Sequence, residues 1–118
     1  MREARISTTV QPQATSRQMM IRPVNFGFNT ETSQSNVFQK AGVPSTDTHI
    51  ECLNEFDHMV NHLHSAGVDL TVFDDSTDID SPDAIFPNNW VSFHQSGKVV
   101  LYPMMAENRR SERRLDII

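Results

Sequence analysis

The 118-residue sequence is poor in cysteine and in long apolar runs, and its middle half lacks positive charge. The single cysteine, Cys52, excludes an internal disulfide and favours a reducing, cytoplasmic setting. No run of about 18 apolar residues is present, so the sequence predicts no membrane span. The N-terminal segment MREARISTTVQPQATSRQ lacks the apolar centre of a secretory signal peptide, and we expect residues 1–17 to form a flexible tail.

Charge is divided unevenly along the chain. Residues 41–97 hold ten acids and no Lys or Arg, whereas the C-terminal tract ENRRSERR is rich in arginine. The net charge of −5 and the interleaved glutamates argue against nucleic acid as a partner. We favour a network of surface ion pairs instead. A second alternative is that one arginine binds a substrate carboxylate through two parallel hydrogen bonds. The network would align arginines four residues apart, Arg109 with Arg113 and Arg110 with Arg114.

The first half of the chain predicts a strand, an irregular segment and a helix. Residues 19–21 are a short apolar strand, and residues 24–44 form a long connection that is a candidate site element. Thr48 and Glu51 fit a capping box at the start of the helix. Gly67 supplies its left-handed end. One apolar face is built by residues spaced three or four apart: Ile50, Leu53, Phe56, Val60 and Leu63.

The second half predicts mainly β-structure. Residues 68–73 are typical of a buried strand, and residues 89–94 with 98–102 predict a hairpin. A charged segment from Ala106 is expected to be helical. A helix between two strands makes them parallel, and the hairpin adds an antiparallel pair. The predicted fold class is therefore α/β with a mixed sheet.

Two motifs on the predicted helix have structural explanations. Cys52 is flanked by Glu51 and Glu55, which raise the pKa of a thiol, so a structural role is favoured over a nucleophilic one. His58 and His62 share a helix side, but the zinc-hydrolase pattern would need Glu where Met59 stands. We predict no metal and no cofactor.

The most informative segment is PDAIFPNNW, residues 82–90. It combines the carboxylate of Asp83, the ring of Phe86 and the neighbouring carboxamides of Asn88 and Asn89. Adjacent carboxamides are poor strand formers and are typical of turns or of sites. One interpretation is a turn whose Asn side chains bond their own backbone. The other is a surface that grips a planar, nitrogen-rich group through hydrogen bonds at fixed angles.

Three stretches together resemble one family: residues 20–29 (MIRPVNFGFN), 82–94 (PDAIFPNNWVSFH) and 101–110 (LYPMMAENRR). They are similar to the N-terminal part of citrulline-utilisation hydrolases, long labelled amidinotransferase-like proteins. These belong to the guanidino-group-modifying superfamily, with arginine deiminase and dimethylarginine dimethylaminohydrolase. The similarity covers the chain from about Met19 to its last residue.

The resemblance implies a five-bladed α/β propeller around a polar central site. Residues 18–118 would then be a partial domain of one or two strand-helix blades, incomplete at its C-terminus. Family chemistry uses a Cys nucleophile and a His from later parts of the chain, and neither has a counterpart here. The resemblance therefore implies a hydrolase fragment that is inactive alone and has no catalytic residues of its own.

The resemblance also places substrate-binding residues in this chain: Asp83, Phe86, Asn88, Asn89, Asn25 and Asn29. The expected substrate is a small amino acid of the citrulline or arginine type. Where related deiminases often carry an acid, this sequence has the Asn pair, which suits a neutral ureido group. The alternative function is a non-enzymatic remnant or interaction module that pairs with another chain through its exposed strand edges. That other chain could be a second copy, which would make a homo-oligomer.

Overall fold

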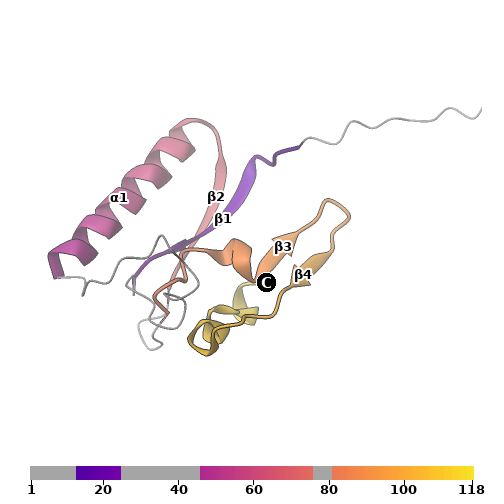
Figure 1. Cartoon of the computed structure of the whole chain (residues 1–118). Helices are drawn as coiled ribbons and strands as arrows, with labels where there is room; N and C mark the ends of the chain where they lie inside the picture. The colour runs from indigo at the N-terminus through magenta and orange to yellow at the C-terminus, as the bar shows by residue number, and fades with distance from the viewer. Residues whose placement is uncertain (1–12, 25–45, 76–80) are drawn as a thin grey trace, which may run out of the picture.

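The computed structural model describes residues 13–24, 46–75 and 81–118. Its strand β1 (Arg17–Arg22) pairs in parallel with β2 (Asp69–Asp74), and the helix α1 (Thr46–Ser65) connects them along the chain. A hairpin of β3 (Val91–Phe93) and β4 (Val99–Leu101) follows. Figure 1 shows α1 on one side of the β1–β2 pair and the hairpin on the other. The predicted parallel pair, helix and hairpin are confirmed.

Helix α1 follows its apolar periodicity. Phe56 is buried, the other apolar positions except Ile50 are half-buried, and Ile50 is exposed. Gly67 ends the helix with a φ of +88°, as predicted. Its N–H donates to the His64 carbonyl, and the N–H of Val68 donates to the Leu63 carbonyl, which satisfies carbonyls left open at the helix end.

The core of the described residues lies where β1 meets the hairpin. Trp90, Val91 and Met104 form a buried cluster, against which Met19 of β1 and Ile117 pack. Trp90 is the most deeply buried apolar residue among those described, with 1% of its surface exposed. The N–H of Tyr102 donates to the Trp90 carbonyl at 2.8 Å, which ties the end of β4 to the same point.

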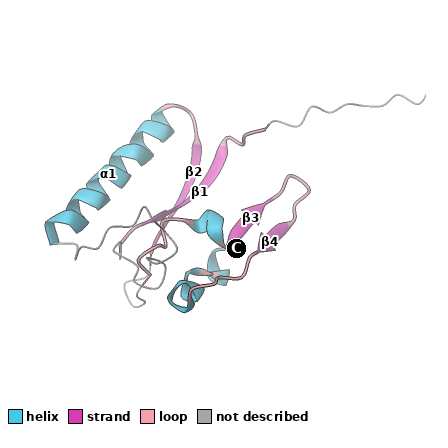
Figure 2. Ribbon diagram, viewed as in Figure 1, coloured by secondary structure: helices cyan, strands magenta, loops and turns pink. Residues whose placement is uncertain are grey.

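Short 3₁₀ helices flank the hairpin, as Figure 2 shows. They are η1 (Pro87–Asn89), η2 (Glu107–Glu112) and η3 (Leu115–Ile117). Pro87 fits the first position of η1 because a proline there has no N–H to leave unpaired. The predicted C-terminal helix is therefore present, but in the tighter form in which residues three apart lie above one another.

The expectation of one mixed sheet was wrong for the described residues. Two separate two-stranded sheets are found, one parallel and one antiparallel. The segment after Ser81 turns repeatedly and enters η1, so the chain reaches β3 without extending the first sheet.

Two finer expectations also need correction. Strand β2 is not buried: among the described residues it pairs with β1 alone, Leu70 and Phe73 are half-buried, and its other four residues are exposed. The capping box is misplaced, because α1 begins at Thr46 and Thr48 lies within its first turn. The long connection of residues 24–44 lies outside the described residues beyond Val24.

Candidate functional site

The segment from Ser81 to Trp90 is wound into consecutive tight turns. Backbone N–H groups donate to carbonyls three residues earlier, from Ala84 to Ser81, from Phe86 to Asp83, and from Asn89 to Phe86. Proline is favoured at the second position of such turns because its φ is already set, and Pro82 occupies that position in the first of them. The buried Trp90 then anchors the end of the segment.

These turns bury one of the predicted site residues and leave three others exposed to solvent. Asp83 is buried, whereas Phe86, Asn88 and Asn89 are exposed. Asn25 and Asn29 lie outside the described residues. The interpretation that the Asn side chains only decorate a turn is not what is seen for Asn89, because its side chain contacts a residue far away along the sequence.

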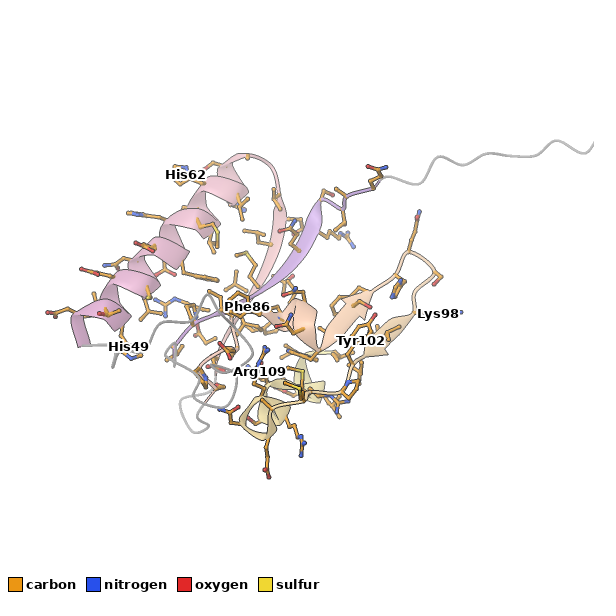
Figure 3. All side chains as sticks on the ribbon, in the orientation of Figure 1. His49, His62, Phe86, Lys98, Tyr102 and Arg109 are labelled. Carbon is orange, nitrogen blue, oxygen red and sulfur yellow. The ribbon has the colours of Figure 1, made fainter. Side chains whose placement is uncertain are left out.

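That residue is Arg109 of η2. Its Nη2 donates to Oδ1 of Asn89 at 3.0 Å, and its Nε lies 3.7 Å from Oδ2 of Asp83. Its strongest contacts are with Glu112, at 3.2 Å from Nε to each carboxylate oxygen and 3.0 Å from Nη2 to Oε2. Figure 3 shows Arg109 beneath Phe86, where the C-terminal segment passes under the wound segment. The fold thus brings Asp83, Asn89 and Arg109 together.

The ion pair of Arg109 and Glu112 is buried, which corrects the expectation of a surface network. The side chains are 13% and 1% exposed. Arg109 does not align with Arg113 as predicted, because in a 3₁₀ helix the side chains at i and i+3 meet. Sequence reasoning missed Glu112, and the only signal for it was its spacing of three from Arg109.

The pKa of Glu112 reflects its burial and the charges around it. Burial raises the pKa of Glu112, its hydrogen bond to Arg109 lowers it, and the nearby charges of Asp83 and Asp75 raise it further. Asp75 is itself buried and accepts a hydrogen bond of 2.6 Å from the hydroxyl of Ser81. The guanidinium of Arg109 therefore contacts two carboxylates, those of Glu112 and Asp83, and Asp75 adds a further negative charge near Glu112.

The three nitrogens of the Arg109 guanidinium differ in their hydrogen bonding, and Nη1 stands apart. The described part of the chain offers no hydrogen-bond partner to its two hydrogens, while Nε and Nη2 are both engaged. A guanidinium presents its donors in a planar fork that fits a carboxylate. Nη1 is therefore the part of this guanidinium that has no partner among the described residues.

A pocket of about 610 Å³ lies beside this cluster, on the side of Asp75, Ser81 and Ser111. None of the predicted binding residues lines it. The contacts of Arg109 with Asn89 and Asp83 connect the three predicted features directly, so they define the candidate site better than the pocket does.

The other sequence motifs lie elsewhere. His58 and His62 are both exposed, and the described residues hold no group of three or more His, Cys, Asp or Glu placed to bind a metal ion. Cys52 is half-buried, and burial, then Glu55 and Glu51, raise the pKa of its thiol, as the sequence predicts. No helix in the described ranges is both long and apolar enough to span a bilayer.

Comparison with known proteins identifies the class. The chain belongs to the guanidino-group-modifying superfamily, as the resemblance implies. The family model that matches, over residues 22–118, is described as N,N dimethylarginine dimethylhydrolase, eukaryotic, and the chain belongs to this family. No curated protein and no solved structure matches the chain. The five-bladed propeller stays a prediction, with which the small α/β arrangement is compatible.

Proposed function

We propose that this chain forms the substrate-binding wall of a cytoplasmic hydrolase that acts on the guanidino or ureido group of arginine-type amino acids. The observation that supports it most is the contact of Arg109 with Asn89 and Asp83, which lie 20 and 26 residues earlier. Family membership supports the same class of substrate, because its printed name is that of a dimethylarginine hydrolase.

The parts of the site suit the parts of such a substrate. The Nη1 edge of Arg109 can receive the carboxylate of a free amino acid. The exposed ring of Phe86 can cover a planar group, and the amides of Asn88 and Asn89 can bond its edge. Because an amide carries no charge, we propose that the preferred planar group is the neutral ureido group of citrulline, ahead of the guanidinium of arginine or dimethylarginine.

The 118 residues alone are proposed to bind without turnover. The described residues contain one thiol, Cys52, and its raised pKa keeps it protonated at neutral pH. Incubation with citrulline, arginine or dimethylarginine should release no ornithine, citrulline or dimethylamine. Turnover that Cys52→Ala abolishes would contradict this part of the proposal.

Binding is tested by NMR titration of the ¹⁵N-labelled chain with citrulline. We expect shifts at Asn89, at the indole of Trp90 and at Arg109, and we expect Asn89→Ala to remove them. Asn61→Ala on the exposed side of α1 is the matched control and should leave them unchanged. Shifts that survive Asn89→Ala, or that centre on α1, would refute the site.

A second function is favoured by one specific observation. Each strand in the described ranges pairs on one side only, and Phe93, Val99 and Leu101 are exposed on one face of the hairpin. An unpaired strand beside an exposed apolar face is a template for pairing. The alternative proposal is therefore an interaction module that joins a second copy of the chain. Sedimentation equilibrium of the wild-type chain and of Val100→Pro decides it, since a monomer in both cases excludes this function.

A further inference from the structure

The orientation of the Asn89 carboxamide follows from what faces it. Arg109 has only hydrogen-bond donors, so the Asn89 atom 3.0 Å from its Nη2 must be the oxygen. The nitrogen Nδ2 then points the other way with its two hydrogens. Among the described residues Nδ2 has no partner. The side chain of Asn89 therefore presents a donor edge.

Asn89 is exposed, so its own surroundings do not fix this orientation. The hydrogen bond from Arg109 does, because a bond to a charged group biases an exposed amide by about tenfold or more. Such a bias requires that Arg109 be held in place. Its contacts to Asp83 are long, 3.5 Å to the carbonyl and 3.7 Å to the carboxylate.

The group that holds Arg109 is the carboxylate of Glu112. It makes three contacts of 3.0 to 3.2 Å with Nε and Nη2. A two-pronged contact of this kind fixes the plane of a guanidinium as well as its position. The side chain of Glu112 is enclosed, with 1% of its surface exposed, so the clamp does not depend on a mobile surface carboxylate.

We propose that Glu112 is a positioning residue that sets the hydrogen-bond polarity of the site. By clamping Arg109 it holds the Asn89 carboxamide with its Nδ2 hydrogens outward. A ureido group has a carbonyl oxygen that can accept a hydrogen bond from Nδ2 of Asn89. A guanidinium has only N–H donors, so its hydrogens would face the Nδ2 hydrogens without an acceptor between them. Glu112 thereby gives the site its preference for acceptor-bearing ligands. The ligand preference rests on the proposed function, but the positioning of Asn89 does not.

The decisive variant is Glu112→Gln. Its amide can accept only on one side and turns a donor towards the other nitrogen of Arg109, so the two-pronged clamp is lost. In the ¹⁵N-labelled, ligand-free chain we expect the Nε–H signal of Arg109 and the side-chain amide signals of Asn89 to shift and broaden. Glu112→Asp, which keeps the charge, should restore part of the wild-type pattern. Glu107→Gln, on the same 3₁₀ helix but exposed, is the matched control and should change neither signal.

The ligand readout is the ratio of dissociation constants for arginine and citrulline. We expect the wild-type chain to favour citrulline by about tenfold, and Glu112→Gln to reduce this ratio by about fivefold or more. If neither ligand binds the wild-type chain, the proposed function fails, and the ligand-free signals still decide whether Glu112 positions Asn89.

If Glu112→Gln does not fold, an acid titration of the wild-type chain tests whether Glu112 positions Arg109 and Asn89. Glu112 faces Arg109 on its own helix and Asp83 and Asp75 from the segments packed against it. Burial raises the pKa of Glu112, so its protonation should loosen the Arg109 and Asn89 signals together at a pH above that of exposed glutamates. Signals that stay unchanged through this titration, or in a folded Glu112→Gln chain with an intact Trp90 indole signal, overturn the proposal.

Discussion

The buried ion pair of Arg109 and Glu112 makes Arg109→Met the most informative single change in this chain. Met fills much of the same volume but carries no charge, so it leaves the enclosed carboxylate of Glu112 without a cation among the described residues. Removal of one partner from a buried ion pair costs about 3–5 kcal/mol. Small domains have free energies of unfolding of about 5–15 kcal/mol, so the loss is a large fraction of the total.

The pH dependence of this loss has a definite sign. Burial already raises the pKa of Glu112 in the folded chain, and removal of Arg109 raises it further because the hydrogen bond that lowers it disappears. A group with a raised folded-state pKa stabilises the fold most in acid, and this contribution is lost as the pH rises through that pKa. The destabilisation by Arg109→Met should therefore be smaller near pH 4.5 than at pH 7.5.

Urea unfolding monitored by fluorescence measures this directly, because Trp90 is the only tryptophan and is fully buried beside the site. A loss of about 3 kcal/mol moves the midpoint by about 2 M when the slope is about 1.5 kcal/mol per molar urea. Arg110→Met is the control, because among the described residues the Arg110 side chain donates to the Met104 and Met105 carbonyls alone, and the change should cost less than about 1 kcal/mol. In a double-mutant cycle with Glu112→Gln, we expect a coupling energy of about 1–3 kcal/mol. A loss below about 1 kcal/mol that does not vary with pH would refute the reasoning.

Three further predictions test the scaffold. Arg22 donates two hydrogen bonds of 2.9 Å to Asp57, which hold the pKa of Asp57 below its usual range, and Asp57→Asn removes the charge and one of the two acceptors. Because both side chains are partly exposed, it should cost about 0.5–1 kcal/mol at pH 7, and urea unfolding should show the difference vanish as the pH falls through the lowered pKa of Asp57. Gly67→Ala should cost about 1–2 kcal/mol in the same assay; its φ is +88° and nothing lies within 4 Å of the added Cβ, so the cost is backbone strain alone. Cys52 should react with iodoacetamide more slowly in the folded chain than in urea at pH 7, because burial raises its pKa, and an equal rate would contradict its structural role.

Much of the fold was predictable because its signals are local. The apolar spacing of α1 and the positive φ at Gly67 and Gly97 depend on neighbouring residues alone, and the sequence shows them directly. The number of sheets is not a local property. It depends on the path between β2 and β3, where consecutive turns and η1 replace an extended chain. The same holds for the exposure of β2, which is set by how many partners the strand has.

The candidate site shows the same division. The pattern of residues 82–90 predicted polar recognition, which stays a prediction, and the structure shows that Asp83 and Asn89 share a partner. That partner could not be found from spacing, because Arg109 lies 20 residues beyond Asn89 and meets it through tertiary packing. The burial of Glu112 was hidden for another reason: the ENRRSERR tract looks like a solvated surface, and only the 3₁₀ geometry turns Glu112 onto Arg109.

The carboxylates around Arg109 give a physical reason for an amide at position 89. The carboxylates of Glu112 and Asp83 already contact Arg109, and burial, together with the charges of Asp83 and Asp75, raises the pKa of Glu112. A carboxylate at position 89 would add a third acid within reach of Arg109 and compete with Glu112 for the same nitrogens. An amide accepts from Arg109 through its oxygen without adding charge, and keeps a donor for the ligand. The neutral amide of Asn89 thus leaves the contact of Glu112 with Arg109 intact and presents a donor by the same hydrogen bond.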